Sequence, residues 1–229
     1  MKAAPLPVDE SVRLRTLQQY YILDTEAEAA FDDLTALIAY ICQTPIAFIS
    51  FIDADRQWFK SKVGLETTEI PRECAFCAHT ILQPHQALIV SNALEDERFV
   101  SNPLVVATPH IRFYAGYPLV APNGCAVGTL CVIDRVPRSL TAEHIKALQT
   151  LSHQVVDLLE RRRDAARFKR TLIRQRQTVT RLRAEQNLMS AVLETAGALV
   201  VVLDPLGHIV RFNRACEQTT HYSFEEVKG

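Results

Sequence analysis

The stretch from Thr141 to Gly197 constrains the fold more than any other feature of this sequence. It contains no proline and no glycine before Gly197 itself, and helix-forming residues dominate it. Proline and glycine are the strongest breakers of a helix. The sequence therefore predicts one long helix over residues 141–195, organised differently from the segments on either side of it.

The positive charge of the chain is concentrated in the same stretch. Residues 160–185 carry ten Lys or Arg against three acids, a balance of +7, which leaves −8 for the rest of a chain whose net charge is −1. Such clustering favours a solvated helix that joins two domains. A nucleic-acid-binding arm is the alternative, but the stretch lacks the interleaved aromatic residues or base-reading motif of such arms. No nucleic-acid partner is expected.

A heptad pattern runs along this helix. One seam position holds Leu158, Ala165, Leu172, Val179, Gln186 and Leu193, and the other holds Arg161, Phe168, Gln175, Leu182 and Met189. Because eight of these eleven residues are apolar, the pattern predicts a parallel two-stranded coiled coil, and hence a homodimer. The polar members of the seam would set its register at a cost in stability. A single exposed helix that leans on its own domain is the alternative.

Composition excludes several classes of protein. At 48% hydrophobic and 22% charged residues, the chain has the apolar content of a packed protein and not of a disordered one. Its uninterrupted apolar runs, such as residues 198–203, are far shorter than the roughly 20 residues of a membrane helix. Residues 1–10 lack the features of a secretory signal. We therefore expect a cytoplasmic protein, no membrane partner, and mostly reduced cysteines.

The region before the long helix predicts an α+β fold. Helical periodicity covers much of the first forty residues. Two β-prone pairs follow, residues 46–52 with 57–63 and residues 113–120 with 126–133, and the second pair flanks the hairpin-forming dipeptide Asn123-Gly124. Between the pairs we expect a helix over residues 73–82 and a short strand over residues 88–90. Gly116 and Gly128 indicate a bulge or a close approach by another group.

The pattern changes again after the long helix. Residues 198–203 and 208–212 predict two strands, and a helix is expected from Arg214 onward. Some thirty residues cannot enclose a core, so we expect the start of a second domain that is cut by the end of the sequence. The expected organisation is an N-terminal arm over residues 1–11, a first domain over 12–140, the helix over 141–195, and the second domain from 196 to 229.

Several phrases of the first domain resemble the bacterial GAF domains found at the front of sensory signalling proteins. These phrases are Leu23-Asp24-Thr25, Phe31-Asp32-Asp33-Leu34, Ile52-Asp53-Ala54-Asp55-Arg56-Gln57-Trp58-Phe59-Lys60-Ser61, Phe76-Cys77-Ala78-His79, Ile111-Arg112-Phe113-Tyr114-Ala115-Gly116, Pro118-Leu119, and Gly128-Thr129-Leu130-Cys131-Val132-Ile133-Asp134. The tail resembles the first third of a PAS domain in Asp204, Gly207, Asn213, Ala215, Tyr222, Glu225, Glu226 and Gly229.

The resemblance implies a fold and a role. GAF domains have a central antiparallel sheet flanked by helices, with any ligand pocket between the sheet and the loops and short helices over one face. Their commonest role is to regulate an output domain, usually a histidine kinase of a two-component system, a diguanylate cyclase or a cyclic di-GMP phosphodiesterase. By this resemblance the chain is not itself an enzyme but relays a sensory state to such an output domain. A further possibility is a domain that binds nothing and only dimerises.

The resemblance also suggests where a small molecule of unknown identity would bind. The candidates for the pocket are Cys77, His79, Asp96, Arg98, Phe99, Arg112 and Tyr114. Each has a structural alternative. The two aromatic residues would then belong to the core, and Arg112 would pair with Asp53 or Asp134. Trp58 is expected to anchor the surface of the first hairpin. No catalytic motif and no glycine-rich phosphate loop is present.

Cys74, Cys77 and His79 form a C-x-x-C-x-H group. A tetrahedral zinc site needs four ligands, and no second cysteine pair is present, so neither a metal nor a cofactor is expected. Two family branches offer an alternative use of Cys77, as the attachment point of a bilin or as a thiol in reduction of free methionine sulfoxide. Bilin-binding relatives place the histidine directly after the cysteine, whereas Ala78 intervenes here and turns the two side chains about 200° apart on a helix.

Overall fold

The computed structural model of the chain describes residues 2–195 and 197–229. Met1 and Ala196, at which two of the expected segments begin, lie outside the described residues. The chain divides into two units, Met1–Ala166 and Arg167–Gly229, and each is described by itself. The long helix α5, Ala142–Thr195, contributes to both units. The absence of proline and glycine predicts one long helix over residues 141–195, and the observed bounds of α5 confirm it.

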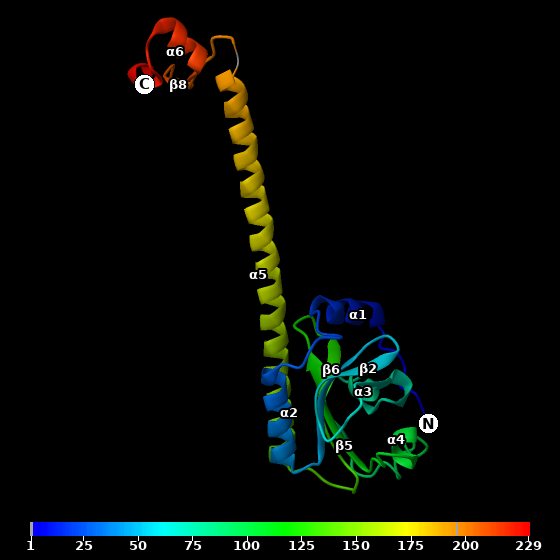
Figure 1. Cartoon of the computed structure of the whole chain (residues 1–229). Helices are drawn as coiled ribbons and strands as arrows, with labels where there is room; N and C mark the ends of the chain where they lie inside the picture. Colours follow the sequence, from blue (N-terminus) through cyan, green and yellow to red (C-terminus); the bar gives the residue numbers. More distant parts are fainter. Residues whose placement is uncertain (1, 196) are drawn as a thin grey trace. The chain divides into compact units, whose positions relative to one another are not determined.

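The first unit contains a six-stranded antiparallel sheet with the order β3-β2-β1-β6-β5-β4 (Figure 1). The strands are β1 Ile46–Ile52, β2 Arg56–Val63, β3 Glu69–Pro71, β4 Leu88–Val90, β5 Phe113–Val120 and β6 Ala126–Asp134. The hairpins β1–β2 and β5–β6 meet where β1 pairs with β6. This arrangement confirms both predicted hairpins and the α+β class.

Helices and short turns surround the sheet. They are α1 Glu10–Gln19, α2 Ala29–Cys42, the 3₁₀ turn η1 Arg72–Cys74, α3 Phe76–Thr80, α4 Pro103–Val106 and the first part of α5. The single helix expected over residues 73–82 is wrong, because Ala75 has extended backbone angles between η1 and α3. The Asn102 amide donates to the Cys74 carbonyl at 3.0 Å. A continuous helix would use that carbonyl for the Ala78 N–H.

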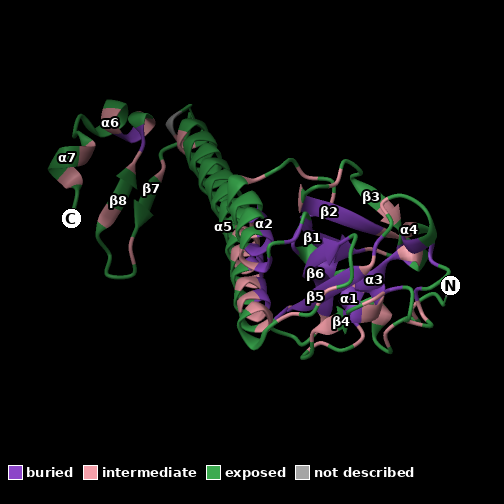
Figure 2. Ribbon diagram, turned by 90° about the horizontal axis from the view of Figure 1, so that it is seen from below, coloured by how far each residue is buried: buried purple, intermediate pink, exposed green. Residues whose placement is uncertain are grey.

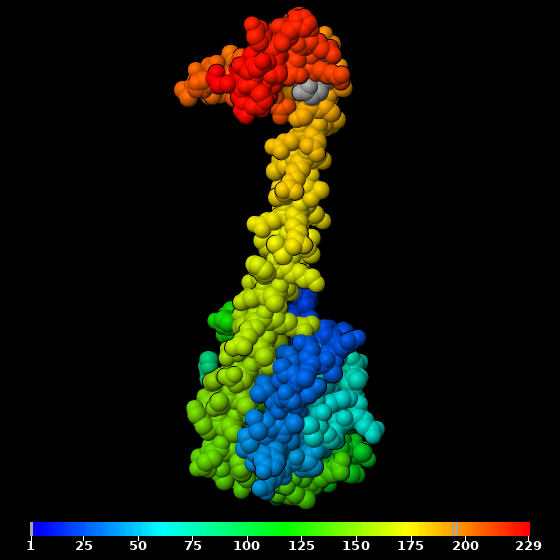
Figure 3. All heavy atoms as spheres, turned by 60° about the vertical axis from the view of Figure 1, so that its left-hand side comes forward, coloured from blue at the N-terminus to red at the C-terminus, as the bar shows by residue number. Residues whose placement is uncertain are grey.

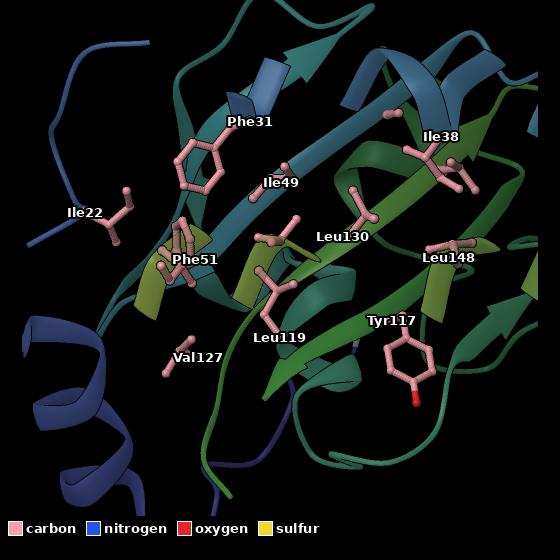
Figure 4. Close-up of a cluster of buried hydrophobic side chains, with 14 of the residues drawn as sticks. Ile22, Phe31, Ile38, Ile49, Phe51, Tyr117, Leu119, Val127, Leu130 and Leu148 are labelled. Carbon is pink, nitrogen blue, oxygen red and sulfur yellow. The ribbon is translucent and has the colours of Figure 1, made fainter. Parts of the chain in front are cut away.

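One face of the sheet packs against α2 and the first turns of α5. Alternate residues of β1, β5 and β6 point to this face, as the two-residue period of a strand requires. Leu148 of α5 and Ile38 of α2 are buried against them (Figure 4). Leu159 of α5 is buried in the same core. In the space-filling view α2 and these turns of α5 lie side by side (Figure 3). Trp58 belongs to the same core, 7% exposed and stacked on Phe51, so the expected surface role of Trp58 is wrong.

The opposite face of the sheet packs against α3, α4 and the loops beside them. This second core contains Ile46, Phe48, Ile52, Phe59, Phe76, Cys77, Ile81, Val90, Ala93, Phe99, Val105, Ile111, Tyr114, Ala126, Cys131 and Ile133. Every residue of β1 and β6 is buried (Figure 2). Strands buried on both faces read as nearly continuous apolar runs, which is the pattern that the sequence has there.

A buried ion network ties α1 to the sheet. The Arg13 guanidinium donates to the Glu10 carboxylate and to the Ile52 carbonyl, each at 2.6 Å. Arg72 also donates to Glu10, at 2.5 Å, and to the carbonyl of Asp53 at 2.9 Å. Burial raises the pKa of Glu10, but the hydrogen bonds and charges of the two arginines outweigh it and lower the pKa from 4.5 to about 2.

The second unit contains the rest of α5 and a small α/β tail. The tail has β7 Val201–Leu203 paired antiparallel with β8 Ile209–Phe212, followed by α6 Arg214–Thr220 and α7 Phe224–Val227. Among its described residues only Asn213 and Cys216 are buried. The expected order of strands and helix is confirmed, and the tail buries almost no side chain. The PAS-like identity of the tail stays a prediction.

Among the described residues, none of the helices combines the length and the apolar content that crossing a bilayer requires.

Candidate functional site

A cavity of about 290 Å³ lies between the second face of the sheet and the segments that cover it. The elements β1, β2, β5 and β6 form its floor, and α3, α4 and the loop after β2 form its walls. Its lining is Ile46, Phe48, Gln57, Phe59, Leu65, Thr67, Ile70, Phe76, Cys77, Leu104, Thr108, Pro109, Ile111, Tyr114 and Ile133. No Asp, Glu, Lys, Arg or His is among these lining residues, so the cavity suits an uncharged, mainly apolar molecule.

Polar side chains are gathered at one place on the cavity wall, around the sulfur of Cys77. The Gln57 amide donates to Cys77 Sγ at 3.2 Å and to Ser50 Oγ at 2.8 Å. The hydroxyl groups of Tyr114 and Ser50 also donate to this sulfur, at 3.4 Å and 3.7 Å. These groups come from α3 and from three different strands of the sheet. Only the tertiary fold brings them together.

Glycines make room for this cluster. A Cβ at position 116 would lie 2.2 Å from the hydroxyl oxygen of Tyr114, so only glycine leaves space for the ring along the strand. From this position the Tyr114 hydroxyl also forms a hydrogen bond with Thr80 Oγ1 at 2.6 Å. At position 128 a Cβ would lie 2.1 Å from the backbone oxygen of Ser50. Both glycines therefore mark close approaches, as the sequence predicts.

The cluster changes the acidity of the buried thiol at its centre. Burial raises the pKa of Cys77, but hydrogen bonds from neighbouring side chains, those of Tyr114 and Ser50 among them, outweigh burial and lower the pKa from 9.0 to about 7. Burial holds the pKa of Cys131 well above 9.0, and its thiol donates to the carbonyl of Phe48 at 3.8 Å. The hydrogen bonds thus favour the thiolate of Cys77 inside an otherwise apolar wall.

Two of the seven predicted pocket residues line the cavity, Cys77 and Tyr114. Phe99 lies behind the lining, buried and stacked on Phe76 with ring centroids 3.9 Å apart. Arg112 donates to the carbonyls of Val105 and Ile111, at 2.9 Å and 3.0 Å. It thereby holds the end of α4 beside β5.

Three other predicted residues lie together under the N-terminal arm. His79 Nε2 is 3.1 Å from the carbonyl oxygen of Lys2, and Asp96 pairs with Arg98 at 2.6 Å. His79 and Cys77 thus project from α3 into different surroundings, as the intervening Ala78 implies. Arg112 does not form the ion pair proposed as its structural alternative with Asp134, whose carboxylate pairs with Arg138 at 2.5 Å.

Most of the cavity lining was not predicted from the sequence. Gln57 and Phe59 are two residues apart on β2, and Phe48 lies on the neighbouring strand β1. A polar Gln57 that is 1% exposed inside a strand is the most informative of them. The alternation of β2 places Gln57 and Phe59 on one face, and this signal is readable from the sequence once the strand is recognised.

The seam residues of α5 have two kinds of surroundings. Leu158 packs against the first core. Four seam residues are exposed, namely Arg161, Ala165, Gln175 and Gln186. Leu193 is half-buried. The large apolar seam residues further along are exposed by 71% at Phe168, 38% at Leu172, 47% at Val179, 53% at Leu182 and 61% at Met189. This stripe has no partner among the described residues of the chain.

The residues that the structure describes contain no cluster of three or more His, Cys, Asp or Glu side chains able to hold a metal ion. In the described part, Cys74 is half-buried on η1 while Cys77 faces the sheet. The C-x-x-C-x-H group therefore does not converge on one point.

Comparison with known proteins agrees with this fold. The family model described as "GAF domain" matches residues 26–157. The chain belongs to the GAF domain family. The chain also resembles the solved structure of the GAF domain of an Acinetobacter phosphoenolpyruvate-protein phosphotransferase, with a TM-score of 0.50, 17% identity, and coverage of 68% of this chain and 98% of that one. The PixJ GAF domain of Thermosynechococcus elongatus, in its blue-light absorbing form, gives a TM-score of 0.52 at 16% identity over 71% and 95% of the two chains.

At such identities the likeness to these two structures shows the fold alone. A sequence relative is more similar. A cyclic di-GMP phosphodiesterase of Pseudomonas aeruginosa is 42% identical over 148 residues, which are 65% of this chain. The match spans only 25% of the length of that relative.

Proposed function

We propose that the chain is a sensory and regulatory module of a bacterial signal-transduction protein. In this proposal the GAF domain senses an uncharged small molecule, and its state passes along α5 of a homodimer to the PAS-like segment and an output domain. The 42% identity with a cyclic di-GMP phosphodiesterase supports an output that makes or degrades cyclic di-GMP over a histidine kinase. The output and its substrate belong to the proposal.

The exposed apolar seam of α5 is the observation that supports the proposal of a homodimer. A helix with a stripe of large apolar side chains in water gains free energy when a second copy covers the stripe, at about 25 cal/mol per Å² of apolar surface buried. Residues 160–185 contain ten basic side chains, and most of these lie outside the two seam positions. Two helices could therefore meet along the seam with most of that charge still in water.

Relay along the coiled coil requires two packings of similar free energy, one of which a ligand favours. Polar seam residues weaken any single packing. Replacing Arg161, Gln175 and Gln186 together with Leu should therefore strengthen one packing and lock one output state. An unchanged response in the full-length protein would contradict the relay.

Light scattering tests the dimer directly, and the chain offers a matched pair of variants. Leu182→Glu places a charge in the seam, whereas Leu188→Glu places it two residues beyond the seam position Gln186. Both side chains are exposed, by 53% and 67%, so neither change should disturb the fold of the monomer. We expect Leu182→Glu to give monomers at micromolar concentration and Leu188→Glu to stay dimeric. A monomeric parent chain, or equal effects of the two variants, would refute the proposal.

Native mass spectrometry of the purified chain tests the ligand. We expect a retained small molecule, and its loss in Phe48→Trp, where the larger ring fills part of a cavity of about 290 Å³. The corresponding control is Phe51→Trp, on the same strand but in the other core. A small molecule that the Phe48→Trp variant still retains would bind outside this cavity.

A further inference from the structure

The Gln57 side chain has an unpaired acceptor in the wall of the cavity. Gln57 lies inside β2 and is 1% exposed. Its amide nitrogen donates to Ser50 Oγ at 2.8 Å and to Cys77 Sγ at 3.2 Å, so both of its hydrogens are used. Its amide oxygen accepts no hydrogen bond from the described residues, and protein atoms do not fully enclose it. Because Gln57 lines the cavity, this oxygen is left to pair with a molecule inside the cavity.

The other buried polar groups of the lining already have partners. The Tyr114 hydroxyl bonds to Cys77 Sγ at 3.4 Å and to Thr80 Oγ1 at 2.6 Å. The sulfur of Cys77 already accepts three hydrogen bonds. The remaining polar residues of the lining, Thr67 and Thr108, are exposed, so water can reach them. A donor group on a molecule in the cavity therefore finds its buried acceptor in the amide oxygen.

The rest of the buried lining is apolar and rich in aromatic rings. Phe48 and Phe59 meet edge to face, with ring centroids 4.7 Å apart. The ring centroids of Phe76 and Tyr114 are 5.2 Å apart. Aromatic rings gain free energy from edge-to-face and offset-stacked contacts with other rings. Since a cavity of about 290 Å³ is at the small end of ligand sites, its size and its rings suit a small aromatic molecule.

We propose that the cavity selects a small aromatic molecule that carries one N–H or O–H group, and that this group donates to the amide oxygen of Gln57. This inference rests on the proposed function, in which the cavity binds an uncharged small molecule, and adds the chemical class of that molecule. An occupant without a donor leaves the amide oxygen unpaired and shut off from water. The cost of the unpaired acceptor makes such a site selective.

Two isomers, 3-methylindole and 1-methylindole, form a matched pair of probes. They have the same size and the same apolar rings, but only 3-methylindole has an N–H. Isothermal titration calorimetry with the whole chain measures both dissociation constants. We expect 3-methylindole to bind more tightly by about 5- to 150-fold, the range for leaving one buried acceptor unpaired. Equal binding of the two isomers, tighter binding of 1-methylindole, or binding of neither overturns the proposal. This comparison needs no variant.

Gln57→Met separates the hydrogen bond from the fit of the methyl group. Methionine has a similar length, but its sulfur is only a weak acceptor. The preference for 3-methylindole should therefore disappear in Gln57→Met, and a preference that persists in the folded variant would refute the role of Gln57. Gln149→Met is the control, because Gln149 bonds to the Tyr117 hydroxyl in the other core and its replacement should keep the preference. Thermal melting and circular dichroism verify that both variants are folded.

Two further measurements distinguish this inference from the proposed function. Binding of 3-methylindole that persists in Phe48→Trp would lie outside the cavity and would overturn the assignment. In native mass spectrometry, a retained molecule without any N–H or O–H group would overturn the ligand class and leave small-molecule sensing intact. A parent chain that retains no molecule and binds neither isomer would refute the sensing of a small molecule as well.

Discussion

Removing the hydroxyl of Tyr114 should raise the pKa of Cys77. Hydrogen bonds hold that pKa at about 7 instead of 9.0, although burial pushes it upward. The Tyr114 hydroxyl donates to the sulfur at 3.4 Å, and a hydrogen bond to a charged acceptor contributes about 1.5–3 kcal/mol. In Tyr114→Phe we therefore expect the pKa of Cys77 to rise by about one to two units.

The assay is the rate of alkylation of Cys77 by iodoacetamide as a function of pH, read from the tryptic peptide 73–98 of a chain that carries Cys74→Ser and Cys125→Ser. Because only the thiolate reacts, a pKa higher by one to two units slows the reaction at pH 7 by about five- to fifty-fold. Tyr117→Phe is the matched control. Its hydroxyl accepts a hydrogen bond from Gln149 at 3.1 Å and belongs to the other core.

An apparent pKa in folded Tyr114→Phe that equals that of the parent chain would refute the role of this hydrogen bond. An equal rise of the pKa of Cys77 in Tyr117→Phe would refute it as well, because the effect would then come from general loosening of the sheet. A melting temperature measured for both variants verifies that the native fold is being titrated.

Three other changes test the fold around the site. Glu10→Gln should lower the free energy of unfolding at pH 7 by about 2 kcal/mol after allowance for solvent screening. The parent chain has this stability above pH 4.5 and loses it as the pH falls toward 2, the lowered pKa of Glu10. Urea unfolding at pH 7 and at pH 2 measures the difference, and equal losses at both pH values would contradict the prediction. The Leu159 side chain is 0% exposed, so Leu159→Ala should lower the free energy of unfolding by about 2–5 kcal/mol in the same assay. Leu182→Ala should lower the free energy of unfolding of the monomer by under about 1 kcal/mol. Gly116→Ala should displace the Tyr114 hydroxyl, which lies 2.2 Å from the new Cβ, and slow Cys77 alkylation; an unchanged rate would refute the close approach.

Local pattern was enough to predict most elements of the first unit. The run of β-prone residues around Asn123-Gly124 predicts the β5–β6 hairpin because turn and strands are encoded within one short segment. Helix α3 shows where local pattern fails. Residues 73–82 have helical composition, yet the Asn102 amide, distant in sequence, binds the Cys74 carbonyl and interrupts the helix. A competing hydrogen bond from outside a segment leaves no trace in the composition of that segment.

The candidate site was predicted less completely than the fold. Cys77 and Tyr114 were identified through family-like phrases, and both line the cavity. His79, which belongs to one of these phrases, and Arg98, which belongs to none, were also placed near the pocket, but both lie under the N-terminal arm. Whether a polar side chain faces a cavity or the surface depends on the direction of its Cα–Cβ bond in the folded element. Sequence proximity on a five-residue helix does not specify it.

The sequence by itself determined the features that depend on neighbouring residues. These are the long uninterrupted helix, the paired strands with alternating faces, and the concentration of positive charge on residues 160–185. Only the tertiary structure decided which side chains surround the sulfur of Cys77. They are Ser50, Gln57 and Tyr114, which the order of strands in the sheet brings together, and not Cys74, three residues away. Strand order and the packing of α3 onto the sheet follow from the summed burial of many side chains, so no single motif reports them.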